Sequence, residues 1–261
     1  MPFNLFLFLI LAPLLNIVQD AKYLIFEKLE NDVNWQLKMS VDGTDNWQNN
    51  WFLDGEIAKV ENSEKGMHVQ AGPEFGNDAH HMVLWTKQSF EGDVKIEFDY
   101  IRTDNETKAV NILYIQATGK EEGEFTGDIS EWNHLRNVPS MRTYFNNMET
   151  LHISFAAFPN NEETQDYMRV RRYPVLPDKS FRELEVEPIF FDTGFFKTGE
   201  TYQVTVIKTD EHLYFKVIGK NDSELYSWNT SHLPPLKEGR IGLRHMYTRS
   251  AIYCNFRIWS K

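Results

Sequence analysis

The feature that most constrains the fold is a succession of short segments, from about residue 56 onward, in which apolar and polar residues alternate. Successive side chains of a β-strand point to opposite faces, so this period of two predicts half-buried strands. Gly, Asn, Asp and Pro separate the segments at intervals typical of an antiparallel sandwich or jelly roll. We expect strands at Ala58–Asn62, Met67–Ala71, His81–Thr86, Asp93–Arg102, Val110–Thr118, Leu151–Phe158, Tyr167–Tyr173, Tyr202–Thr209, His212–Gly219, Arg240–Met246 and Ala251–Trp259.

One stretch interrupts the strand pattern. Residues 128–148 have helix-like spacing, with Asp128 and Ser140 in the positions of helix N-caps. An insertion of this kind between two strands often shapes the rim of a binding site. No repeat or linker divides the chain of 261 residues, so we predict a single domain over residues 22–261.

The first residues favour export. The segment from Phe3 to Leu15 is almost wholly apolar but too short to span a bilayer about 30 Å thick, so it predicts a signal peptide over residues 1–21. The protein would then be secreted or periplasmic, with no membrane contact once the peptide is removed. The net charge of −11 argues against a nucleic-acid partner, because phosphate binding requires a basic surface.

Four strings of the sequence resemble those of the YesU-like family. They are His81–Trp85, Leu151–Phe155, Tyr167–Tyr173 and Arg240–Tyr247. This is a bacterial family of unknown function in the concanavalin A-like lectin/glucanase superfamily. The resemblance implies a jelly roll of two curved antiparallel sheets and an association with polysaccharide breakdown. It supplies no catalytic residues, so function has to be argued from the site itself.

A group of cationic, imidazole and phenol side chains is the leading candidate site. It comprises His81, His152, Arg169, Arg171, Tyr173, Arg244 and His245. We expect His81, His152, Arg169, Arg171 and His245 to converge in one groove on the same sheet face. Arginine suits the carboxylate or sulfate of an acidic sugar. We assign His152, Tyr173 and His81 as candidates for acid and base catalysis, and the arginines with His245 as substrate-binding residues. The alternative is a lattice of structural ion pairs.

Two carboxylates form the second candidate catalytic site. Glu97 and Asp99 share one face of a predicted strand, and glycoside hydrolysis uses a pair of carboxyl groups. Retaining glucanases of the superfamily have a Glu-x-Asp-x-(x)-Glu pattern, whereas the run from Glu97 to Arg102 lacks the last glutamate. The alternative for this pair is a solvated strand face.

Trp85 shares a face with His81 by alternation and is a candidate platform for a sugar ring, with core packing as the alternative. We expect no cofactor. A structural calcium ion, which the superfamily often carries, remains open, and Asp42–Asn46 has a suitable composition. These features favour a monomeric enzyme acting on an acidic poly- or oligosaccharide, either a polysaccharide lyase or a glycoside hydrolase. A non-catalytic carbohydrate-binding module is the alternative.

Overall fold

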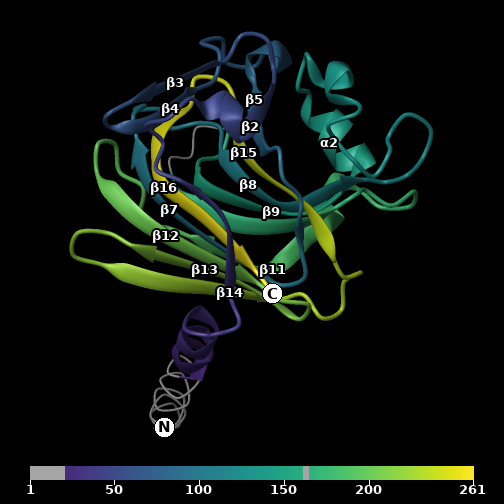
Figure 1. Cartoon of the computed structure of the whole chain (residues 1–261). Helices are drawn as coiled ribbons and strands as arrows, with labels where there is room; N and C mark the ends of the chain where they lie inside the picture. Colours follow the sequence, from purple (N-terminus) through teal and green to yellow (C-terminus); the bar gives the residue numbers. More distant parts are fainter. Residues whose placement is uncertain (1–20, 161–164) are drawn as a thin grey trace, which may run out of the picture.

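Two antiparallel sheets packed face to face form the protein in the computed structural model, which describes residues 21–160 and 165–261 (Figure 1). Sheet A has the strand order β14-β13-β12-β7-β16-β4-β3, and β1 also pairs with β16. Its strands are β1 (Gln36–Val41), β3 (Lys59–Ser63), β4 (Gly66–Gln70), β7 (Val94–Arg102), β12 (Thr201–Lys208), β13 (His212–Ile218), β14 (Ser223–Asn229) and β16 (Ser250–Ser260).

Sheet B has the order β11-β10-β9-β8-β15-β5-β2, and the short β6 pairs with β15. Its strands are β2 (Trp51–Asp54), β5 (Met82–Thr86), β6 (Phe90–Glu91), β8 (Asn111–Gly119), β9 (Met148–Ala157), β10 (Tyr167–Tyr173), β11 (Glu185–Phe191) and β15 (Glu238–His245). The predicted all-β jelly-roll sandwich is therefore confirmed. All eleven predicted strands are present, with shifted ends in most cases.

The main core fills the space between the sheets. Inward-facing residues of both sheets meet there, including Phe98 and Tyr100 from β7 and Ile153 and Phe155 from β9. These are the apolar positions of the alternating pattern, and burying large apolar side chains is the main source of stability in such a sandwich.

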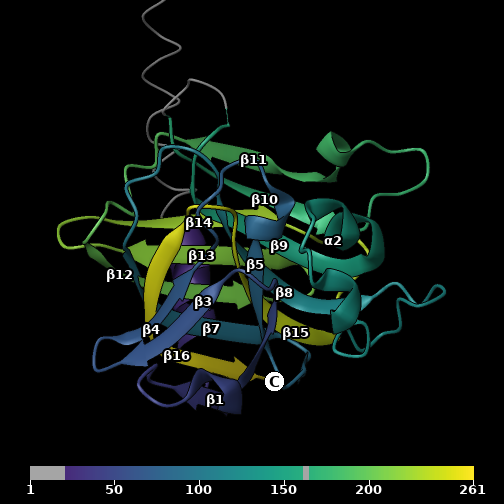
Figure 2. The ribbon, with the colours of Figure 1, turned by 90° about the horizontal axis from the view of Figure 1, so that it is seen from above.

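Helical turns connect the strands. They are η1 (Trp47–Asn49), η2 (Asp78–His80), η3 (Asn133–Arg136), α2 (Met141–Asn147) and η4 (Phe181–Leu184). The predicted helical insertion is thus present as η3 and α2, although it is less helical than expected. Figure 2 shows α2 over the outer face of sheet B, where it packs against β9 and β10.

A second helical segment, residues 21–30, lies against the outer face of sheet A (Figure 1). Its Phe26 is fully buried against Ile207, Tyr214 and Leu225, one residue from each of β12, β13 and β14. No helix among the described residues is long and apolar enough to cross a membrane. The predicted signal peptide, except for its last residue, lies outside the described part of the chain.

Candidate functional site

A pocket of about 440 Å³ opens on the outer face of sheet B, on the side away from sheet A. Strands β8, β9 and β10 form its floor, and α2 and η4 form one wall. We call it the arginine pocket. Its lining residues are Val110, Ile112, Met141, Phe145, His152, Ser154, Phe158, Pro159, Asn160, Tyr167, Arg169, Arg171, Phe181, Phe191 and Met246.

Alternation along β10 places the two arginines in this pocket. Met168 and Val170 face the main core, so Arg169 and Arg171 point outward. One oxygen of Glu185 on the neighbouring β11 accepts from both: 3.0 Å from Arg169 Nη1 and 2.6 Å from Arg171 Nη2. Two guanidinium groups therefore share one carboxylate, and none of the residues that line the pocket is acidic. The pocket is a positively charged site in a protein of net charge −11.

His152 lies in the floor beside Arg171, its register partner across β9 and β10. The imidazole is fully buried, and its Nε2 lies 3.4 Å from Ser154 Oγ. Burial, with a further contribution from Arg171, holds the pKa of His152 well below its usual range. His152 is therefore neutral at neutral pH, able to donate or accept a hydrogen bond but weakly basic.

Tyr173 packs against His152, with ring centroids 4.9 Å apart. Burial raises the pKa of Tyr173 well above its usual range, so the hydroxyl stays protonated. It is suited to donating a hydrogen bond, whereas the tyrosinate needed for a base is strongly disfavoured.

Aromatic rings hold the two arginines in place. The guanidinium of Arg169 lies over the ring of Tyr167 at 4.7 Å, and that of Arg171 lies over Phe181 at 4.3 Å. Such contacts orient the planar donors without consuming all of their N–H groups. The Nε atoms of both arginines have no hydrogen-bond partner among the described residues.

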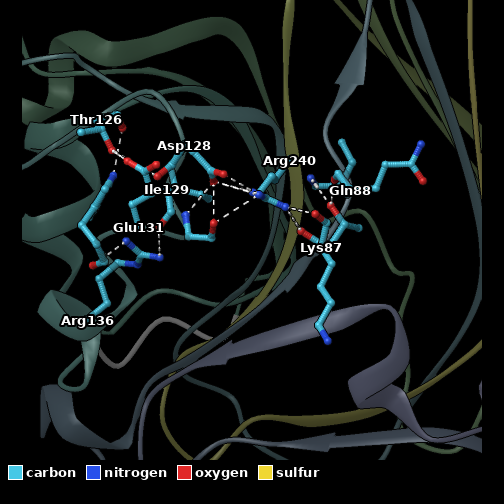
Figure 3. Close-up of polar contacts among 12 residues, drawn as sticks. Lys87, Gln88, Thr126, Asp128, Ile129, Glu131, Arg136 and Arg240 are labelled. Atoms are coloured by element: carbon cyan, nitrogen blue, oxygen red, sulfur yellow. Dashed lines mark hydrogen bonds and ion pairs between the residues drawn. The ribbon is translucent and has the colours of Figure 1, made fainter.

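The insertion that bears α2 is anchored to sheet B by charged groups. Figure 3 shows Arg240 of β15 paired with Asp128, at 2.8 Å and 3.0 Å to the two carboxylate oxygens. Deeper in the molecule, Arg136 donates from Nε to Asp54 at 2.6 Å, and both side chains are fully buried. Asp54 also accepts from Tyr144 of α2 at 2.8 Å. These contacts fix the wall of the arginine pocket.

The structure brings together His152, Arg169 and Arg171 as expected, but four other candidates do not line the pocket: His245, Trp85, His81 and Arg244. His245 points to the opposite face of sheet B, where its Nε2 lies 2.9 Å from Tyr253 Oη in the main core. Trp85 is on the pocket side but completely buried, stacked on Tyr114 at 5.2 Å and bonded to Asp54. It packs beneath the insertion and does not offer an open platform for a sugar ring.

His81 and Arg244 are adjacent to each other but do not line the arginine pocket. Arg244 Nη2 donates to His81 Nδ1 at 2.6 Å and to the carbonyl oxygen of Pro139 at 2.5 Å. Burial lowers the pKa of His81 to about 2, with Arg244 as a further cause. His81 is thus a buried acceptor for an arginine, and this geometry gives no support for its role in proton transfer.

Glu97 and Asp99 lie on the outer face of sheet A, on the other sheet from the arginine pocket. Glu97 pairs with Lys95 at 3.4 Å and with Arg257 at 3.2 Å, while Asp99 accepts from Asn255 at 2.6 Å. This is the solvated strand face that was the alternative for the pair.

Several residues that line the pocket or bond to its arginines are absent from the candidates drawn from sequence. Glu185 begins a strand that the pattern did not predict, and Phe145 and Phe181 come from helical segments. Ser154 shares a face with His152 by alternation, and this was the sequence signal that could have identified it.

In the Asp42–Asn46 loop, Asp42 accepts from the backbone and hydroxyl of Thr44, both at 2.8 Å. The structural calcium ion stays a prediction.

Comparison with known protein families identifies the family of the chain. The model of DUF1961, described as a domain of unknown function, matches residues 38–258. The chain belongs to the DUF1961 family. No curated protein matches this DUF1961 sequence.

Solved structures similar to this DUF1961 protein have lectin-like folds. A Bacillus subtilis protein of unknown function with a galectin-like fold has a TM-score of 0.59 at 16% identity, over 86% of this chain and 97% of that one. The exoplasmic/lumenal domain of VIP36, bound to Ca²⁺ and Man3GlcNAc, has a TM-score of 0.56 at 12% identity, over 87% and 90%. A legume lectin-like domain from Entamoeba histolytica has a TM-score of 0.54 at 9% identity, over 85% and 97%. These likenesses confirm a lectin-like fold in a family of unknown function, while the YesU-like assignment and the monomeric state stay predictions.

Proposed function

We propose that the protein binds an acidic saccharide in the arginine pocket. The observation that carries this proposal is the pair Arg169 and Arg171 sharing the single carboxylate of Glu185 at the wall of a pocket lined by aromatic rings. Arginine forks bind carboxylate and sulfate groups, and aromatic rings offer apolar surface to the faces of a sugar. The mannose-containing ligand of the VIP36 domain, which has a similar fold, supports a saccharide as the occupant.

The setting of the pocket favours binding over catalysis. His152 has a strongly lowered pKa and Tyr173 a strongly raised one, both because of burial. Neither change produces a group that takes up and releases a proton near neutral pH, as general acid–base catalysis requires. The same neutral groups are suitable partners for sugar hydroxyls. We further propose that binding occurs outside the cytoplasm, in line with the apolar segment that begins the sequence.

The test is affinity electrophoresis and isothermal titration calorimetry of the full chain with uronate oligosaccharides and with neutral oligosaccharides of equal length. We expect binding of the uronates to be the tighter and to weaken as salt rises. Loss of charged hydrogen bonds in Arg171→Ala should reduce the affinity about 10-fold to 100-fold. Arg257→Ala, which removes an exposed arginine of sheet A, is the matched control and should change nothing. Equal affinity for neutral sugars, or an unaltered Arg171→Ala variant, would contradict the proposal.

A second candidate function is β-elimination of a uronate, supported by the contact of His152 with Tyr173 beside Arg171. In that reaction a base takes the C5 proton, the C4–O4 bond breaks, and an acid protonates the leaving oxygen. Ultraviolet absorbance of the unsaturated product would reveal it, and a reducing-sugar assay would reveal hydrolysis. Binding without either product would support saccharide binding as the only one of the two functions.

A further inference from the structure

A buried polar cluster lies next to the arginine pocket, between sheet B and α2. It consists of Tyr114, His152, Tyr173 and Arg244, and all four side chains are completely buried. Tyr114 and His152 are register partners on β8 and β9, with ring centroids 5.9 Å apart. The rings of Tyr114 and Tyr173 are 6.2 Å apart. His152 belongs to both the cluster and the lining of the pocket, so the cluster adjoins the pocket.

Several polar atoms of this cluster have no hydrogen-bond partner among the described residues, although Arg244 Nη2 donates to His81 and Pro139 and His152 Nε2 lies near Ser154 Oγ. The unpartnered atoms are the hydroxyls of Tyr114 and Tyr173, Nδ1 of His152, and Nε and Nη1 of Arg244. Arg244 and Tyr173 lie close enough to the Tyr114 hydroxyl to lower its pKa, although burial dominates and raises it. Neither makes a hydrogen bond of good geometry to that hydroxyl.

Arg244 also has no ion-pair partner in the described part of the chain. The nearby buried carboxylate, Asp54, is occupied by Arg136 and by three neutral donors, Trp85, Tyr144 and Asn133. A buried guanidinium without a counter-charge is strongly unfavourable, and buried polar groups in native proteins are almost always hydrogen-bonded. The cluster therefore contains several hydrogen-bond donors without an acceptor and one guanidinium without a counter-charge among the described residues.

We propose that the cluster is the closed end of the arginine pocket and binds an oxyanion, a carboxylate or sulfate, on the terminal residue of a saccharide chain. Tyr114, Tyr173 and Arg244 are the donors. This inference rests on the proposed function and adds the part of the ligand that is recognised. It predicts recognition of chain ends, whereas a groove open at both ends would bind the interior of a chain.

The surroundings of the cluster support an end-binding site. Tyr144 of α2 covers it, stacked on Tyr114 at 5.9 Å and lying under the guanidinium of Arg244 at 4.6 Å. Trp85 of β5 stacks on Tyr114, with ring centroids 5.2 Å apart, and closes the cluster on that side. Met141 and Phe145 of α2 line the arginine pocket, and we expect them to move aside when the anion enters. Methionine is flexible enough to permit this.

The experiment uses the full chain with two isosteric changes, Tyr114→Phe and Tyr173→Phe, made singly and together. Each removes only an unpartnered hydroxyl. We expect the midpoint of thermal unfolding to stay the same or rise, because a buried hydroxyl without a partner is destabilising. We expect the affinity for a uronate disaccharide to fall about 10-fold to 100-fold in the double variant, since hydrogen bonds to a charged group are lost.

Tyr253→Phe is the matched control. Its hydroxyl is buried in the main core and bonded to His245, so this variant should lose stability and keep its affinity for the disaccharide. A second readout compares the disaccharide with long uronate chains at equal concentrations of chain ends. End recognition predicts equal binding at equal concentrations of ends.

The outcomes separate the two proposals. Unchanged affinity in the Tyr114→Phe, Tyr173→Phe double variant, or affinity per chain that grows with chain length, would overturn end recognition while leaving the arginine pocket as a saccharide site. Lower stability with unchanged affinity would assign the hydroxyls to structural hydrogen bonds and also overturn it. A wild-type protein that binds no acidic saccharide would refute the proposed function itself.

Discussion

The insertion depends on one buried carboxylate, and replacing it by an amide should be among the most damaging conservative changes in the protein. Asp54 Oδ2 accepts from Trp85 Nε1 at 2.7 Å, from Arg136 Nε at 2.6 Å and from Tyr144 Oη at 2.8 Å. The other oxygen accepts from Asn133 at 2.6 Å. In Asp54→Asn the side chain keeps its size, but Arg136 loses its counter-charge and an N–H group must face existing donors.

The expected cost follows from this geometry. Removing one partner of a buried ion pair costs about 3–5 kcal/mol, because the remaining charge stays buried. Total stabilities of domains are about 5–15 kcal/mol, so the loss is a large fraction. The measurement is urea denaturation followed by tryptophan fluorescence. We also expect weaker saccharide binding, because α2 supplies Met141 and Phe145 to the pocket wall.

Asp128→Asn is the matched control, since it removes a carboxylate paired with an arginine at the other end of the same insertion. The Asp128 side chain is 45% exposed, and exposed pairs contribute about 0–1 kcal/mol. If Asp54→Asn costs no more than Asp128→Asn, the buried ion pair is not what holds the insertion.

Three further predictions follow from the pocket, the buried histidines and the docked helix. Glu185→Gln should increase the affinity for uronates, because it removes the carboxylate that competes with the ligand for the two arginines; calorimetry showing weaker binding would contradict this. The free energy of unfolding should fall as the pH drops below about 6.5, by about 1.4 kcal/mol per pH unit for each buried histidine. The reason is that each of these histidines binds a proton in the unfolded chain but stays neutral in the folded one. Burial lowers the pKa of His81 to about 2, that of His245 to about 3 and that of His152 strongly, so the loss continues to well below pH 5; denaturation at several pH values, with a reduced slope in His152→Asn, checks it. Phe26→Ala should cost about 3 kcal/mol in urea denaturation, whereas Ile25→Ala, at a position 52% exposed, should cost less than about 0.5 kcal/mol.

Much of the fold was predictable because apolar and polar residues alternate along a strand that has one face in the core and the other face outside it. In β10 the pattern separates Val170 from Arg169 and Arg171, and the structure agrees. Alternation also places the neighbours Arg244 and His245 on opposite faces, so the assignment of both as substrate-binding residues of one site was wrong although the pattern contained the information.

Other features lay beyond the pattern for physical reasons. β11 and β14 are edge strands of their sheets, and β11 contains Pro188 and exposed residues that blur the alternation. Glu185 could not be paired with the arginines because its position depends on how the chain returns after η4. The burial of Trp85 depends on how closely the insertion packs, which local propensity does not determine.

The helical segment 21–30 covers an apolar patch on the outer face of sheet A. Phe26 fills an apolar patch on β12, β13 and β14, Lys22 Nζ bonds to the carbonyl oxygen of Leu225, and Glu30 pairs with Lys216 at 3.3 Å. Cleavage after residue 21 would leave these contacts intact. A cut even two turns further along the helix would uncover Ile207, Tyr214 and Leu225 on a surface already formed by edge and near-edge strands. A protein cut at that point would expose an apolar patch that favours self-association. Trimming by proteases at this end should therefore reduce solubility before it affects the arginine pocket on the opposite sheet.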